Sequence, residues 1–128
     1  MATYKPKILV VDDEPDARQA LAHSLRAKGY EVLEAAGGAE VLERAKAEWP
    51  TLIILDILLP DVAGTEVLDR LKKDPLTRAI PVLLLTAKPD VVEQIPLLRE
   101  KSRQYRYVDK PERTEDLLAI VHNMLTGS

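Results

Sequence analysis

The hydrophobic residues of this chain fall into short apolar runs that alternate with longer stretches of helical periodicity. The apolar runs cover residues 8–11, 52–55, 82–85 and 105–108. Runs of this length between helical patterns are typical of parallel strands that are buried on both faces. The run 31–34 carries two Glu residues, so we expect it to form a strand near an edge of the sheet.

Between these runs, apolar residues recur every three or four positions, which is the spacing of one helix face. The pattern predicts helices at 16–28, 39–48, 64–73 and 114–125. In the first helix we expect Ala17, Leu21 and Leu25 to face the sheet. The inward positions expected in the other three helices are Val41, Leu42, Ala45, Val67, Leu68, Leu71, Leu117, Val121 and Met124.

Two positions disturb the simple pattern of predicted helices. Residues 90–102 could form a further helix, but Pro96 lies inside it and would remove a backbone donor and kink it. Trp49, which precedes Pro50 at the end of the second predicted helix, is expected to pack against that helix end.

The alternation of strands and helices predicts an α/β fold in which helices cover both faces of a parallel sheet. We therefore expect a doubly wound three-layer sandwich of five strand–helix units, (βα)5. A chain of 128 residues is long enough to bury one hydrophobic core. The expected organisation is a single domain over residues 1–128, with its core at about 5–126, and no output domain after the last helix.

The composition is ordinary for a soluble globular protein, with 46% hydrophobic and 30% charged residues. A net charge of −3 argues against a nucleic-acid-binding domain, which is usually basic. The absence of Cys excludes disulfides and thiolate metal sites. No apolar stretch approaches the roughly 20 residues that span a bilayer, and the N-terminus resembles no signal peptide. We therefore expect a cytoplasmic protein that does not bind membranes.

Polar side chains follow four of the predicted strands. They are Asp12, Asp13, Asp56, Thr86 and Lys110. Because the carboxyl ends of parallel strands meet at one edge of a sheet, these side chains are expected to share a crevice. Three carboxylates, a hydroxyl and an ammonium group suit a divalent cation and a phosphoryl group. Taken singly, each has a simpler explanation, because Asp12 and Asp13 could cap a helix and Lys110 could be a surface lysine.

The order and spacing of these residues resemble the receiver domain of bacterial two-component response regulators. The matching segments are Val-Asp-Asp-Glu at 11–14, Gly-Tyr-Glu-Val at 29–32, Gly-Ala-Glu-Val-Leu at 38–42, Leu-Asp-Ile-Leu-Leu-Pro-Asp-Val-Ala-Gly at 55–64, Leu-Thr-Ala at 85–87 and Asp-Lys-Pro at 109–111. The resemblance covers about residues 5–126. It implies a flavodoxin-like fold with the parallel strand order 2-1-3-4-5.

The resemblance also implies a phosphorylation switch. Asp56 would be the phosphoacceptor, and a sensor histidine kinase or a phosphotransfer protein would supply the phosphoryl group. In the family pattern Mg²⁺ or Mn²⁺ is held by Asp13 directly, by Asp12 more often through water, by Asp56 and by the backbone carbonyl of Leu58. Oxygen atoms are the ligands that such hard cations prefer.

Thr86 and Lys110 would stabilise the phosphoryl oxygens. Tyr107 matches the family's switch aromatic, with Tyr105 as the competing candidate on the same strand face. The surface expected to change is that of the fourth helix, fifth strand and fifth helix, which would bind a downstream protein or a second copy. Residues 99–106, with four basic residues against one acidic, lie there on an otherwise acidic chain and could steer an acidic partner.

Two other functions would also use residues of this set. One is a pseudo-receiver that binds partners without accepting phosphate, and the complete set of five polar residues argues against it. The other is a Mg²⁺-dependent phosphohydrolase of the haloacid-dehalogenase type. Such enzymes carry a second Asp two residues after the nucleophile, where this chain has Leu58. We therefore expect a phosphoacceptor that is not an enzyme, apart from catalysing its own phosphorylation and dephosphorylation.

Overall fold

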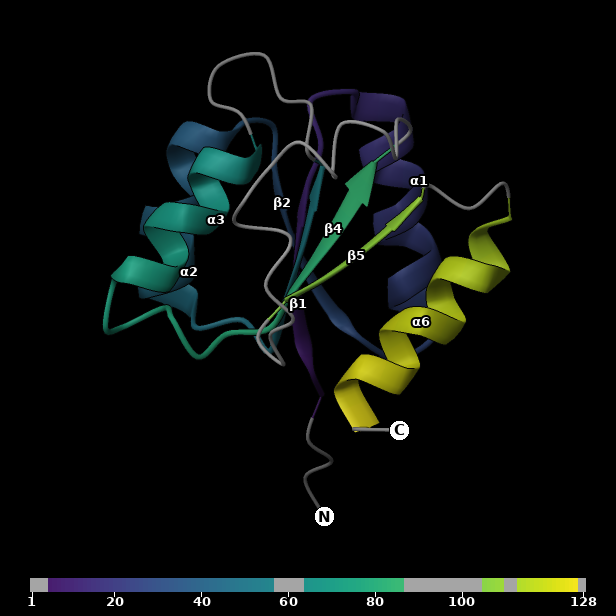
Figure 1. The fold of residues 1–128 in the computed structure, drawn as a ribbon. Coiled ribbons are helices and arrows are strands. Elements are labelled where there is room, and N and C mark those ends of the chain that lie inside the picture. The colour runs from purple at the N-terminus through teal and green to yellow at the C-terminus, as the bar shows by residue number, and fades with distance from the viewer. Residues whose placement is uncertain (1–4, 57–63, 87–104, 110–112, 127–128) are drawn as a thin grey trace.

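A parallel sheet with helices on both faces forms the centre of the protein (Figure 1). The structure is a computed structural model that describes residues 5–56, 64–86, 105–109 and 113–126. Its strands are β1 (Lys7–Val11), β2 (Glu31–Ala35), β3 (Leu52–Asp56), β4 (Val82–Thr86) and β5 (Tyr105–Asp109). Its helices are α1 (Pro15–Ala27), the 3₁₀ turn η1 (Gly38–Glu40), α2 (Val41–Glu48), α3 (Gly64–Lys73) and α6 (Thr114–Thr126).

The strand order is β2-β1-β3-β4-β5, and every neighbouring pair is parallel. The predicted α/β class and strand order are therefore confirmed, as is the position of the 31–34 strand at an edge. The expected helix over 90–102 lies outside the described residues.

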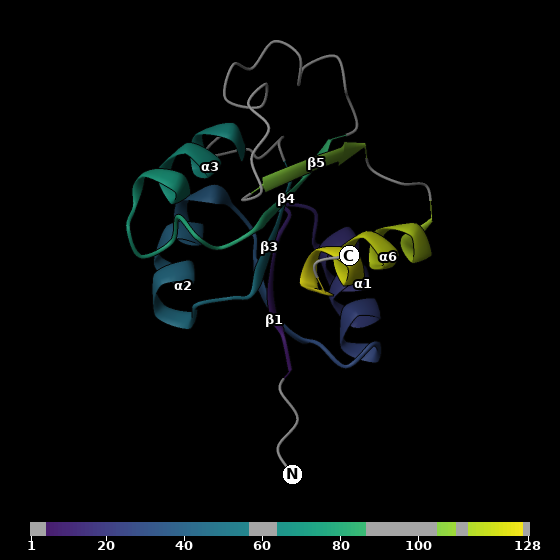
Figure 2. The same cartoon turned by 60° about the horizontal axis from the view of Figure 1, so that its bottom comes forward.

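Each face of the sheet carries its own hydrophobic core. Leu9 and Val11 of β1 belong to the cluster packed beneath α2 and α3, whereas Ile8 and Val10 belong to the cluster beneath α1 and α6. Figure 2 shows the two pairs of helices on opposite sides of the sheet. Successive strand residues point to opposite faces, so a continuous apolar run is what two covered faces require. Complete burial of one such aliphatic side chain contributes about 1.5–3 kcal/mol to stability.

Helix α1 departs from its predicted inward face. Its buried residues are Ala22 and Leu25, while Leu21 is half-buried and Ala17 is exposed. Ala17 borders a groove of about 250 Å³ between α1 and α6 rather than a packed contact. The prediction for Ala17 was therefore wrong, because helical periodicity cannot locate the point where a neighbouring helix stops covering the face.

Trp49 also differs from its prediction, because 65% of its surface is exposed. It follows the last residue of α2 and takes a left-handed backbone conformation, with φ 48°. Large side chains rarely adopt this region, which is usually left to Gly or Asn at helix ends. The adjacent Pro50 is buried instead.

The connection between α3 and β4 is tied down by side chains. The hydroxyl of Thr77, which is completely buried, donates to the carbonyl of Leu71 at 2.7 Å. The Nζ atom of Lys72 donates to the carbonyls of Arg78 and Ile80 at 3.1 and 2.9 Å. Burial lowers the pKa of Lys72 to about 8. The Thr77 bond satisfies a carbonyl in the last turn of α3, and the Lys72 bonds hold two carbonyls of the segment that leads into β4.

Candidate metal centre at the carboxyl edge of the sheet

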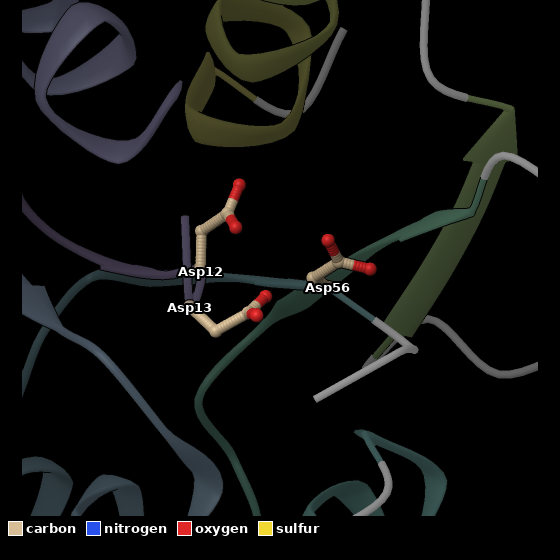
Figure 3. A group of neighbouring side chains, drawn as sticks. All are labelled: Asp12, Asp13 and Asp56. Atoms are coloured by element: carbon tan, nitrogen blue, oxygen red, sulfur yellow. The ribbon is translucent and has the colours of Figure 1, made fainter. Parts of the chain in front are cut away.

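Three carboxylates meet where β1 and β3 end. Val11 of β1 is paired with Leu55 of β3, so Asp12 and Asp56, one position further on, lie side by side. With Asp13 they form a group in which one carboxylate oxygen from each residue lies within 4.8 Å of the others. Figure 3 shows the three side chains gathered at this edge. The convergence predicted for these residues from their places after two strands is therefore present.

The three carboxylates differ in their exposure. Asp56 is only 8% exposed, Asp12 is half-buried and Asp13 is exposed. Asp56 thus forms the inner wall of the site, and Asp13 lies at its mouth. Carboxylates this close repel one another when ionised, and a cation between them relieves that repulsion.

Backbone and side-chain hydrogen bonds hold the loop that carries Asp12. Its N–H donates to the carbonyl of Ala35 at 3.1 Å, which extends the β1–β2 pairing past the end of β1. Its Oδ1 accepts from the N–H of Glu14 at 3.0 Å, and its carbonyl accepts from Nη1 of Arg18 at 2.9 Å. Sequence reasoning missed Arg18. The available signal was a basic residue in the first turns of the helix that follows the Asp pair.

The other predicted site residues can be placed only in part. Thr86 is the last residue of β4, directly after Leu85, which pairs with Asp56. The backbone of Thr86 therefore lies at the same edge of the sheet as the carboxylates. Tyr107 lies in β5 opposite Leu84. The remaining two, Leu58 and Lys110, lie outside the described residues.

A groove leads away from the carboxylates between α1 and α6. Asp12 is one of its lining residues, and its volume is about 250 Å³. Leu21 and Leu117 contribute apolar lining, and Arg113 contributes a guanidinium from the segment before α6. The described part of the site thus borders a groove on the α1–α6 side of the sheet.

Comparisons with known proteins agree with this fold and this site. A sequence profile described as the response regulator receiver domain matches residues 8–122. Protein PilH of Pseudomonas aeruginosa is 33% identical over 94% of this chain and 98% of its own length. The alkaline phosphatase synthesis transcriptional regulatory protein PhoP of Bacillus subtilis is 42% identical over 95% of this chain. The chain spans only 49% of PhoP, about half the length of that relative.

Solved structures show the same architecture. The receiver domain of the sensor histidine kinase PA1611 of Pseudomonas aeruginosa superposes with a TM-score of 0.83 and 25% identity, covering 98% of this chain and 100% of that domain. That structure holds a magnesium ion in its active-site cleft. The chain belongs to the response regulator receiver domain family and is a receiver domain of two-component signal transduction.

Proposed function

We propose that Asp56 accepts a phosphoryl group from a sensor histidine kinase or a phosphotransfer protein. The observation that carries the proposal is the cluster of Asp12, Asp13 and Asp56, whose carboxylate oxygens lie within 4.8 Å of one another. Asp56 is the innermost of the three and ends the central strand β3. A carboxylate in this position can act as the nucleophile towards phosphorus.

The donor set fits Mg²⁺, which prefers oxygen ligands and keeps several waters. Asp13, at the mouth, would bind the cation directly, Asp12 would hold it more through water, and Asp56 would supply one oxygen. The backbone carbonyl of Leu58 would complete the protein ligands. Mn²⁺ accepts the same oxygen donors. The magnesium ion in the cleft of the PA1611 receiver domain supports this assignment.

In the proposed transfer, an oxygen of Asp56 attacks the phosphorus of a phosphohistidine on the partner. The new P–O bond forms as the P–N bond breaks, and the electron pair of the broken bond stays on the imidazole nitrogen, which takes up a proton from water. The ammonium group of Lys110 and the hydroxyl of Thr86 would stabilise the charge on the phosphoryl oxygens. A bound cation supplies further positive charge there. Attack by water on the phosphorus of the acyl phosphate would break the P–O bond to Asp56, release inorganic phosphate and return the carboxylate.

The consequence of phosphorylation is proposed to be a change of surface. Thr86 and Lys110 would move towards the phosphoryl group, and Tyr107 would turn inward. The affected surface would comprise the segment between β4 and β5, β5 itself and α6. It would bind a downstream protein or a second copy of the chain, with no direct contact to nucleic acid. The charge of one phosphoryl group on Asp56 can shift the equilibrium between two conformations of such a surface.

Receiver domains act as phosphoacceptor switches and are not conventional enzymes, and we propose the same for this chain. Residues 1–128 would form one receiver domain, because the five strands share a single sheet. Among the described residues, no helix has the length and apolarity needed to cross a membrane. We place the protein in the cytoplasm, where a kinase could phosphorylate it.

The assignment of Asp56 is tested by labelling with a small phosphodonor, followed by mass spectrometry. The parent protein should gain one phosphoryl group only when Mg²⁺ or Mn²⁺ is present, and Asp56→Asn should gain none. Asp69→Asn is the matched control, because Asp69 lies on α3 and pairs with Lys73, away from the cluster. Unchanged labelling of Asp56→Asn would contradict the assignment.

A further inference from the structure

Arg18 connects helix α1 to the backbone of residues 12–14, the acidic loop between β1 and α1. Its Nη1 atom donates to the carbonyl of Asp12 at 2.9 Å, and its side chain is only 15% exposed. That carbonyl belongs to the peptide group that joins Asp12 to Asp13. Because a peptide group is planar, one hydrogen bond to its oxygen restrains the backbone on both sides. Arg18 therefore acts on both carboxylate-bearing residues of the loop without touching either carboxylate.

The guanidinium of Arg18 is itself held at a second point. Its Nε atom lies 3.3 Å from Oε1 of Glu34 on the edge strand β2. Two contacts on different sides of a rigid planar group define its position, which a lysine ammonium would not achieve. The acidic loop, α1 and β2 are thus joined through one side chain.

We propose that Arg18 is a positioning residue for the metal centre, and that Glu34 orients Arg18 and offsets part of its charge. The inference rests on the proposed function of the Asp cluster as a cation site. Three carboxylates within 4.8 Å repel one another before a cation arrives. A loop that is already restrained resists this repulsion, so less ordering remains to be done when the metal binds.

Glu34 explains how an arginine can serve a cation site. An unpaired guanidinium behind Asp12 would repel the incoming cation, and the carboxylate of Glu34 beside it offsets part of that repulsion. The carboxylate of Glu34 also lies 3.5 Å from Nη2 of Arg26. Glu34 thereby reduces the positive charge that faces the Asp cluster, while the hydrogen bond from Arg18 to the loop is retained.

Arg26 provides a matched control on the same helix. It contacts the same carboxylate of Glu34, but its Nη2 atom donates to the carbonyl of Val32 at 3.1 Å and not to the acidic loop. Its side chain is 51% exposed. The variants Arg18→Met and Arg26→Met therefore remove the same kind of group from the same partner, and only the first removes a contact with Asp12.

The test compares Mg²⁺ binding by calorimetry in the parent, Arg18→Met, Arg18→Lys and Arg26→Met proteins. We expect Arg18→Met to bind Mg²⁺ about tenfold more weakly, the usual effect of losing a group that orients a metal ligand. Arg18→Lys should recover part of this loss, and Arg26→Met should bind like the parent. In labelling with a small phosphodonor, Arg18→Met should need about tenfold more Mg²⁺ for half-maximal rate, with little change in the rate at saturation.

Amide exchange in the metal-free protein gives a readout that is independent of metal and phosphate. The N–H of Glu14, which donates to Oδ1 of Asp12, should exchange faster in Arg18→Met and at the parent rate in Arg26→Met. Equal Mg²⁺ affinity and equal exchange in these two variants would overturn the role of Arg18. If Arg18→Met fails to fold, Glu34→Gln decides instead, since it should weaken Mg²⁺ binding severalfold, and more at low salt than at high salt.

An unchanged affinity in Glu34→Gln at both salt concentrations would overturn the part given to Glu34. A parent protein that neither binds Mg²⁺ nor accepts phosphate would overturn the proposed function itself. The exchange experiment on the metal-free protein would still report whether Arg18 restrains the loop, so the two failures are distinguishable.

Discussion

Asp12 and Asp56 lie side by side because the residues before them, Val11 and Leu55, are paired across β1 and β3. Their carboxylate oxygens lie within 4.8 Å, although the two residues are far apart in the sequence. The distance follows from the parallel register, in which both strands end at the same edge of the sheet. The acidic cluster is therefore a consequence of strand pairing as well as of residue type.

The first prediction concerns the division of labour between Asp12 and Asp13. Asp13→Ala should weaken Mg²⁺ binding more than Asp12→Ala, because Asp13 is proposed as the direct ligand. Both variants should fold, because each removes one repulsive charge. In the absence of metal Asp13→Ala should be at least as stable as the parent, whereas Asp12→Ala also loses the hydrogen bond from the N–H of Glu14. Calorimetry measures the Mg²⁺ affinity, and urea unfolding measures the free energy of unfolding. Asp16→Ala on α1 is the control. Parent-like affinity in Asp13→Ala would refute the assignment.

The second prediction concerns the switch surface. Beryllofluoride, a mimic of the phosphoryl group, should change amide exchange over residues 88–108 in the parent and leave Asp56→Asn unchanged. Sedimentation in the same samples reports whether a second copy binds. A change confined to the loops around Asp56 would mean that the proposed surface is wrong.

The third prediction concerns the buried hydroxyl of Thr77. Thr77→Val keeps the side-chain volume but removes the 2.7 Å hydrogen bond to the carbonyl of Leu71. The free energy of unfolding should fall by about 1–2 kcal/mol, because a buried acceptor loses its partner. Thr126→Val is the control, since that exposed hydroxyl donates to the backbone carbonyl of His122 in the last turn of α6. Urea unfolding measures both variants. An equal loss of unfolding free energy in Thr77→Val and Thr126→Val would contradict the role given to the burial of Thr77.

The fourth prediction concerns the backbone of Trp49. With φ at 48°, a residue that carries a Cβ costs roughly 1 kcal/mol more than Gly at this position. Trp49→Gly should therefore be more stable than Trp49→Ala by about 1 kcal/mol, because both lack the exposed ring and only the alanine retains the strain. Circular dichroism is the suitable probe of unfolding, since Trp49 is the single tryptophan. A more stable Trp49→Ala would disprove the strain.

Much of the fold could be predicted from the chain because it depends on local patterns. The apolar runs at 52–55 and 82–85 match the buried strands β3 and β4, and the helix predicted at 64–73 has the bounds of α3. The glycine that ends α1, Gly29, has φ +93°, as expected of a helix stop. The places of Asp12 and Asp56 after two apolar runs were enough to expect them at one edge.

Contacts between distant segments were decided only by the tertiary structure. Periodicity placed Ala17 against the sheet, but the groove between α1 and α6 leaves it exposed. The bond from Arg18 to the Asp12 carbonyl depends on how α1 packs beside β1, and its pairing with Glu34 depends on β2 lying next to β1. A periodic pattern records which face of an element is apolar, whereas the partner of a polar group depends on where the elements meet in space.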